Sequence, residues 1–280
     1  MKTVKGLHEK MGTFENANTS FHQAARCKRY TNEVLAFSMV KEEELLRATE
    51  EIQNLTYRQG EYKIFKVFEP KERLIMALPF YDRVVQHMIC NAIQPVFENG
   101  FYYHSYACRS GKGMHAASDT LYQWMYETEV KQGLRMYAFK GDISKYFASI
   151  PHDKLKDENR RYIGDKKALM LMDDIIDHNG ILPDGVGIPV GNLTSQLFAN
   201  VYGNKLDKFC KHVLHIPYFV RYMDDFIILS DDLEQLKEWV KRIEEFLENE
   251  MLLHINPKST ILYAGNGIDF CGYIHHADHK

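Results

Sequence analysis

The segment FVRYMDDFIIL, residues 219–229, contains two apolar runs that flank a pair of adjacent acids. Apolar runs rich in β-branched and aromatic residues predict strands, and two such runs around a short polar break predict a β-hairpin. Asp224 and Asp225 then lie at its turn. Two adjacent negative charges repel each other unless solvent or a dication neutralises them. The pair therefore indicates either a solvated turn or part of a metal site.

Length and composition place the chain among ordinary globular proteins. Its 280 residues allow one or two domains, and 45% are hydrophobic and 26% charged. The formal net charge of -3 argues against a uniformly basic nucleic-acid binder, although a local groove can still be basic.

Cysteine usage predicts a reducing compartment. The five cysteines are scattered, their number is odd, and no pair has CxxC spacing. This argues against a disulfide framework and a zinc ribbon. Neither a signal peptide nor an apolar run long enough to span a bilayer is apparent, so we expect a cytoplasmic protein without a membrane segment.

The first half of the chain predicts mainly helices. Residues 1–30 are polar and rich in cations, which fits a solvated helix face or a phosphate-contacting arm. Helices are predicted at residues 32–56, 80–97 and 115–127. Between them, residues 64–68 and 74–78 predict a hairpin with Lys71 and Arg73 at its tip.

The second half brings acids and glycines to the ends of elements. A strand over residues 136–147 contains Asp142, and a glycine-rich loop at 184–192 opens a helix over 193–212. Residues 232–250 form the clearest amphipathic helix. A strand pair is predicted from 260–263 and 269–274. Three histidines follow, at 275, 276 and 279, and their position predicts a frayed tail rather than a metal site.

This layout places Asp142 and Asp224 on neighbouring strands of one antiparallel sheet. Two carboxylates from separate strands can hold two metal ions ~3.5–4 Å apart, which suits in-line phosphoryl displacement. Because the ligands are all oxygens, Mg²⁺ is favoured over zinc or copper.

Several motifs in order resemble those of reverse transcriptases. Tyr222-Met223-Asp224-Asp225 resembles their YxDD box, and residues 139–147 resemble the first palm motif, with an aromatic five residues after the acid. Residues 270–273 resemble the primer-grip hairpin, and Lys71-Glu72-Arg73 with the Arg109 loop resemble the fingers motifs of prokaryotic enzymes. The resemblance extends from about residue 60 to residue 276.

The resemblance implies an α+β, right-hand fingers–palm fold with an antiparallel palm sheet. It implies an N-terminal arm and fingers over residues 1–135 and a palm with a primer-grip-like hairpin over 136–280. Only four residues follow His276, so we expect a missing or minimal thumb, through truncation or because a partner supplies one.

The resemblance also implies an RNA-directed DNA polymerase, a nucleotidyltransferase that uses Mg²⁺, or Mn²⁺ in its place, with dNTPs, an RNA template and a DNA product. The implied catalytic and metal residues are Asp142, Asp224, Asp225 and the Ile143 backbone. The implied nucleotide-binding residues are Lys71, Arg73, Phe147, Val190, Gly191 and Lys258. The implied nucleic-acid-binding residues are Arg109, Lys112, Gln196 and Gly272.

One segment suggests a subclass. Most reverse transcriptases carry Gln-Gly in the loop before the palm helix, whereas this chain has Val190-Gly191 followed by Ser195-Gln196. That pattern resembles the prokaryotic diversity-generating retroelements, which copy a template-repeat RNA into error-prone cDNA. It implies a basic accessory variability protein oligomer as partner, which would offset this chain's acidic balance.

Two alternatives remain open at this point. The chain could be a reverse transcriptase of the retron or phage-defence kind. It could also be an RNA-binding scaffold with a silent palm, although such a palm would be expected to lack one of the metal acids, and all three are present.

Overall fold

A computed structural model describes residues 3–68 and 72–279. The chain divides into two compact units, which we call the helical unit (Met1–Gly100 and Pro151–Phe198) and the sheet unit (Phe101–Ile150 and Ala199–Lys280). Each unit thus combines two separate stretches of sequence. The predicted functional division after residue 135 stays a prediction, since these units divide the chain differently.

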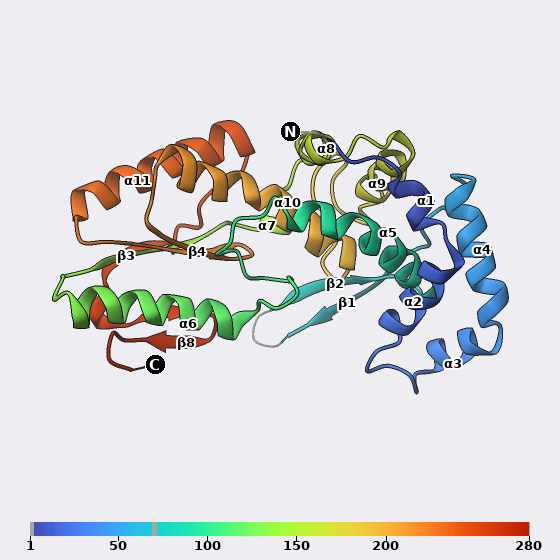
Figure 1. Ribbon diagram of the computed structural model, residues 1–280, viewed down its shortest axis with the longest axis horizontal. Helices are drawn as coiled ribbons and strands as arrows, with labels where there is room; N and C mark the ends of the chain where they lie inside the picture. The colour runs from blue at the N-terminus through green and yellow to red at the C-terminus, as the bar shows by residue number, and fades with distance from the viewer. Residues whose placement is uncertain (1–2, 69–71, 280) are drawn as a thin grey trace. The chain divides into compact units, whose positions relative to one another are not determined.

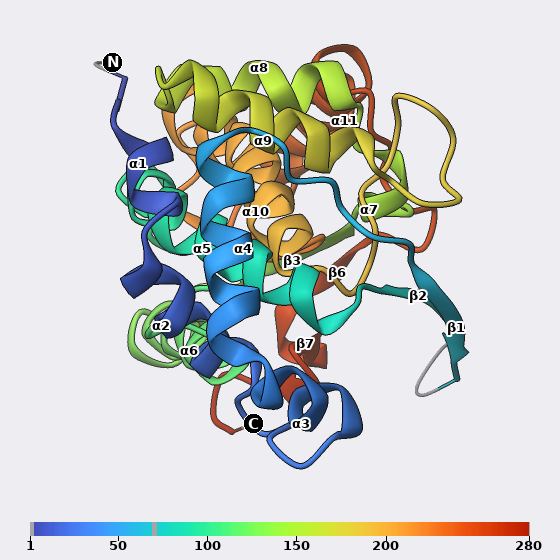
Figure 2. The ribbon, with the colours of Figure 1, turned by 90° about the vertical axis from the view of Figure 1, so that its right-hand side faces the viewer.

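Helices dominate the helical unit, where α5 packs against α1 and α2 (Figure 2). Its elements are α1 (Leu7–Met11), α2 (Phe14–Ala24), α3 (Asn32–Met39), α4 (Lys41–Gln53), β1 (Lys63–Val67), β2 (Arg73–Ala77), α5 (Phe80–Glu98), α8 (His152–Tyr162), α9 (Lys166–Asp177) and the start of α10 (Leu193–Lys208). The single helix predicted over 32–56 is wrong. It breaks at Val40, whose φ of -122° and ψ of 26° are not helical.

The predicted hairpin is confirmed as β1 and β2, which pair from Lys63↔Ala77 to Val67↔Arg73. The glycine-rich loop lies along β2, because the Met76 amide donates to the Val190 carbonyl at 3.0 Å. Gly191 follows with a φ of +119°, and a Cβ there would lie 3.2 Å from the Met76 carbonyl oxygen. A side chain at this position would therefore be strained. Lys71 lies outside the described residues.

The sheet unit is built on a four-stranded antiparallel sheet of order β4-β5-β3-β6. Helix α11 covers one face and α6 the other (Figure 1). Its elements are α6 (Met114–Met125), β3 (Tyr137–Asp142), α7 (Tyr146–Ser149), the rest of α10, β4 (Tyr218–Tyr222), β5 (Asp225–Ser230), α11 (Leu233–Phe246), β6 (Thr260–Tyr263), β7 (Ile268–Phe270) and β8 (Tyr273–His275). π-helical turns at 126–131, 209–213 and 247–251 extend α6, α10 and α11.

Strand alternation sorts the core of this sheet into two faces. Ala138, Ile227 and Leu229 join the apolar cluster against α6. Phe139 and Phe226 meet edge to face on the opposite side, with ring centroids 5.8 Å apart. Because side chains alternate, the residues of β3 that share the face of Ala138 are those at positions 140 and 142. The pleat of the strand therefore places Asp142 on the α6 face of the sheet.

Two sequence predictions near the C-terminal end are wrong. Residues 260–263 pair with β3, as in Thr260↔Lys140, and not with 269–274. Residues 268–275 form a separate hairpin whose turn holds Cys271 and Gly272 at positive φ. His275 is also not frayed, since its side chain is fully buried with Nε2 2.7 Å from Ser118 Oγ.

Candidate active site

Two of the predicted acids face each other across neighbouring strands. Asp142 ends β3, Asp225 begins β5, and the two are direct partners in the antiparallel register. Partners in such a ladder project to the same face with Cβ atoms about 4.5–5.5 Å apart. The sequence predicted adjacent strands with acids, which is confirmed, but it paired Asp142 with Asp224 rather than with Asp225.

Asp224 lies in the tight turn between β4 and β5. Its carbonyl accepts from the Ile143 amide at 3.2 Å, so the turn is tied to the end of β3. Met223, the residue before it, has a φ of +60°. A non-glycine residue in the left-handed region costs of order 1 kcal/mol and is kept where the surroundings impose it.

The surroundings of Asp225 disfavour the ionisation of its carboxyl group. Burial first, then Asp224 and Asp142, raise the pKa of Asp225 to about 6. The Lys140 ammonium opposes this rise, while donating to Asp269 of β7 at 2.8 Å. A carboxylate whose ionisation is disfavoured in the bare protein is one that a bound dication would neutralise.

A buried ion pair stabilises the turn between β4 and β5. Arg221 and Asp207 are both fully buried, and Arg221 Nε and Nη2 donate to the two Asp207 oxygens at 2.6 and 2.7 Å. Arg221 Nη1 also donates to the Met223 carbonyl at 2.8 Å. Sequence reasoning passed over this pair, although a lone charge inside the apolar run FVRY was a visible signal.

Phe147 and Lys258 belong to the same unit as the acids. Phe147 is half-buried on α7, and its neighbour Tyr146 is buried with its hydroxyl donating to the Ala199 carbonyl. This division fits a core role for Tyr146 and leaves Phe147 available to a ligand. Lys258 is exposed, and its backbone amide donates to Asn256 Oδ1 at 3.1 Å.

The predicted nucleic-acid contacts of this unit have other partners. Arg109 Nη1 donates to the carbonyls of Tyr102 and Ser105, and Lys112 Nζ donates to the Tyr103 carbonyl. Both cations thus stabilise their own loop. Gly272 is exposed in the β7–β8 turn with a φ of +80°.

The remaining predicted residues lie in the helical unit. Arg73 begins β2 and is exposed, Val190 and Gly191 lie beside β2, and Gln196 is in the first turn of α10. Arg73, Val190 and Gly191 are therefore grouped at β2.

The donor set of the acid cluster fits a hard cation. It consists of carboxylates at one end of the central strands β3 and β5 and in the adjoining turn, which suits Mg²⁺ or Mn²⁺ rather than a thiolate- or imidazole-binding metal. Within residues 3–68 and 72–279, no group of three or more His, Cys, Asp or Glu side chains is arranged so that it could hold a metal ion.

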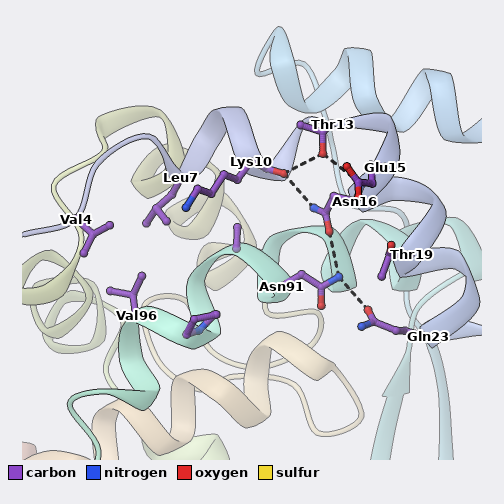
Figure 3. A pocket seen from close by; sticks show the side chains of 12 residues that line it. Val4, Leu7, Lys10, Thr13, Glu15, Asn16, Thr19, Gln23, Asn91 and Val96 are labelled. Carbon is purple, nitrogen blue, oxygen red and sulfur yellow. Dashed lines mark hydrogen bonds between the residues drawn. The ribbon is translucent and has the colours of Figure 1, made fainter.

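A separate hollow of about 550 Å³ lies between α1, α2 and α5 (Figure 3). Its polar side chains bind one another and the backbone: Asn91 Nδ2 donates to Asn16, Ser20 and Gln23, and Asn16 Nδ2 donates to the Met88 carbonyl at 2.8 Å. We interpret this hydrogen-bond network as a structural contact that holds α2 against α5.

An antiparallel sheet covered by helices, with acids at one end of its central strands and in a tight turn, is the palm of a right-hand nucleic-acid polymerase. The sequence matches the reverse transcriptase (RNA-dependent DNA polymerase) family over residues 66–275, and the chain belongs to that family.

Relatives with curated descriptions are distant. The chain is 25% identical over 238 residues to Protein YkfC of Escherichia coli, covering 69% of this chain and 60% of that protein. It is 22% identical over 254 residues to a putative COX1/OXI3 intron 2 protein of Saccharomyces cerevisiae, covering 69% and 29%. A 91 kDa protein in the cob intron of Schizosaccharomyces pombe is 29% identical over 137 residues, covering 47% and 16%. The chain thus spans less than two thirds of each relative.

Solved structures share the fold. Telomerase from Candida albicans, in complex with the TWJ fragment of telomeric RNA, has a TM-score of 0.57 at 12% identity and covers 80% of this chain and 47% of that one. Apo telomerase from Candida tropicalis, truncated of its C-terminal domain, has a TM-score of 0.56 at 14% identity and covers 85% and 59%.

Within the described residues, no helix is long and apolar enough to cross a membrane.

Proposed function

We propose that the chain is an RNA-directed DNA polymerase that depends on Mg²⁺, with Mn²⁺ as a substitute. The observation that carries the proposal is the pairing of Asp142 with Asp225 at one end of the central strands β3 and β5, with Asp224 in the adjoining turn. Family membership supports the reaction class.

In this proposal the chain's residues hold and orient the reactants. Asp142, Asp224 and Asp225 provide oxygen ligands, together with the Ile143 backbone. Bound Mg²⁺ supplies charge neutralisation at the attacking and leaving oxygens of nucleotidyl transfer. Lys258 neutralises the triphosphate, and Phe147 packs against the deoxyribose. Lys71 and Arg73 are further triphosphate ligands from the fingers.

The test removes one acid. Asp224→Ala should abolish Mg²⁺-dependent dNTP incorporation on an RNA template while the variant keeps the circular dichroism and melting temperature of a folded protein. Asp231→Ala, at an exposed acid just beyond β5, is the matched control and should retain activity. Full extension by the Asp224 variant would refute the assignment.

We further propose that the enzyme copies a template-repeat RNA with frequent errors, as in the diversity-generating retroelements. The supporting observation is the Val190-Gly191 pair, which lies along β2, and the Ser195-Gln196 pair on α10. A Gln amide at position 190 could hydrogen-bond near a nascent base pair, whereas Val has neither donor nor acceptor. A basic accessory oligomer is the partner that this subclass implies.

The variant Val190→Gln tests this subclass. One hydrogen bond is worth roughly 0.5–1.5 kcal/mol net, or about two- to tenfold in error rate. cDNA copied from a defined RNA by Val190→Gln should therefore contain fewer errors at template adenines than wild-type cDNA, with comparable extension. An unchanged error spectrum would mean that Val190 does not set fidelity.

The names of two relatives favour a second candidate template, intron RNA. In that case the polymerase would copy a structured intron rather than a template repeat. Sequencing the RNA that copurifies with the chain from its native host separates the two, because a repeat-containing RNA and an intron are distinct species.

A further inference from the structure

The loop at residues 254–259 runs antiparallel to the end of β3 and forms hydrogen bonds with the backbone around Asp142. The Asn256 amide donates to the Asp142 carbonyl at 2.7 Å, and the Ser144 amide donates to the His254 carbonyl at 2.9 Å. The Asp142 amide in turn donates to Ser259 Oγ at 3.0 Å. The main chain of this acid is thus fixed on both sides of its Cα.

The same loop also holds the carboxylate. Asn256 Nδ2 donates to Asp142 Oδ2 at 2.5 Å, across 114 residues of sequence. The orientation of this amide is determined, because Asn256 Oδ1 accepts from the Lys258 backbone amide at 3.1 Å. An oxygen is required on the Lys258 side, so the NH₂ group must face the carboxylate.

We propose that Asn256 is a positioning residue for the metal site. By binding Oδ2 it restricts rotation of the Asp142 carboxyl group, so that Oδ1 would be the oxygen offered to a bound dication. Without this bond the carboxylate would sample both orientations. Binding a dication would then have to fix one of them, at a cost in conformational entropy. The inference rests on the proposed function, since it assigns Asp142 as a metal ligand.

Two variants separate positioning from loop integrity. Asn256→Ala removes the amide and the acceptor for Lys258. Asn256→Ser keeps a short oxygen that can still accept from the Lys258 amide, as in an ST turn, but cannot reach Asp142. Asn249→Ala, at an exposed asparagine after α11, is the matched control.

The readout is Mn²⁺ binding by the full chain without nucleic acid, measured as free Mn²⁺ by electron paramagnetic resonance. Asn256→Ser should bind Mn²⁺ about two- to tenfold more weakly, the range expected for one lost hydrogen bond. The Mg²⁺ concentration for half-maximal extension should rise by the same factor, while the rate at saturating Mg²⁺ and the melting temperature stay near wild type. Asn249→Ala should leave all of them unchanged.

A double variant tests the route through Asp142. In an Asp142→Asn background, Asn256→Ser should cause no further loss of Mn²⁺ affinity. If Asp142→Asn weakens Mn²⁺ binding but neither Asn256 variant does, the positioning role is wrong and the polymerase assignment stands. If Asp224→Ala extends primers normally, the proposed function itself fails, whatever the Asn256 variants do.

Discussion

At the scale of single residues, Asp225 shows how burial and neighbouring carboxylates lower the stability of a fold. Its folded pKa of about 6 lies above the ordinary 3.8. The protonated carboxyl is therefore favoured by the fold. That contribution to stability is fully present below the unfolded pKa and is lost as pH rises through about 6. Near neutral pH the bare protein is destabilised by this charge.

Asp225→Asn should consequently stabilise the metal-free protein. A shift of about two pKa units corresponds to ~3 kcal/mol at most, and partial exposure reduces this to about 1–2 kcal/mol at neutral pH. Urea unfolding in EDTA from about pH 4 to pH 7.5 measures it: wild type should lose stability across this range, relative to the variant. Parallel pH profiles for the two proteins would contradict the shifted pKa.

Phe147 is the second residue for which a single substitution tests a proposed role. Its ring is half-buried, on the short helix α7 five residues after Asp142. If it packs under the sugar, a ribose 2′-oxygen collides with it. Phe147→Ala should then raise rNTP incorporation relative to dNTP by at least tenfold, or about 1.4 kcal/mol of discrimination. Competition assays on one RNA template give the ratio. An unchanged ratio with activity retained would assign Phe147 to the core.

At the scale of elements, the β4–β5 hairpin depends on the Arg221–Asp207 pair. Removing one partner of a buried ion pair leaves an uncompensated charge and typically costs about 3–5 kcal/mol. Asp207→Asn should lower the free energy of unfolding by that order. The double variant Arg221→Met/Asp207→Leu should recover much of the stability, because no charge remains buried.

Activity should not recover with stability in that double variant. The Met223 carbonyl loses its donor from Arg221, so the turn that carries Asp224 is less constrained. We expect primer extension to remain well below wild type, measured beside urea unfolding on the same preparations. A stable double variant with full activity would show that Arg221 serves the fold alone.

The same elements show what sequence can and cannot predict. The β4–β5 hairpin, β3 with its acid and the amphipathic α11 were predictable, because each follows from a local period or a turn. The pairing of β6 with β3 was not, because a short strand does not encode its partner. Asn256 was missed for the same reason: its bond to Asp142 spans 114 residues. The helix break at Val40 could not be predicted either, because no Gly or Pro lies within residues 32–56.

At the scale of the whole molecule, the balance of charge limits how strongly the proposed RNA template can be attracted. Lys and Arg number 35 against 38 Asp and Glu, so no general positive field attracts a phosphate backbone. Of the cations proposed to meet nucleic acid or nucleotide, Arg109 and Lys112 donate to carbonyls of their own loop. A small number of phosphate contacts is therefore expected.

The salt dependence of RNA binding measures that number. For a single strand the slope of log K against log salt is about -0.7 per phosphate contact, so about three contacts give a slope near -2. Fluorescence anisotropy of a labelled single-stranded RNA, from about 50 to about 300 mM KCl, should show this shallow slope. If Lys258 makes one of the contacts, Lys258→Gln should reduce the slope by about 0.7. A basic accessory protein should steepen the slope when added, because it supplies the charge that this chain lacks. A slope of about -5 or steeper for the isolated chain would instead indicate a basic groove of its own.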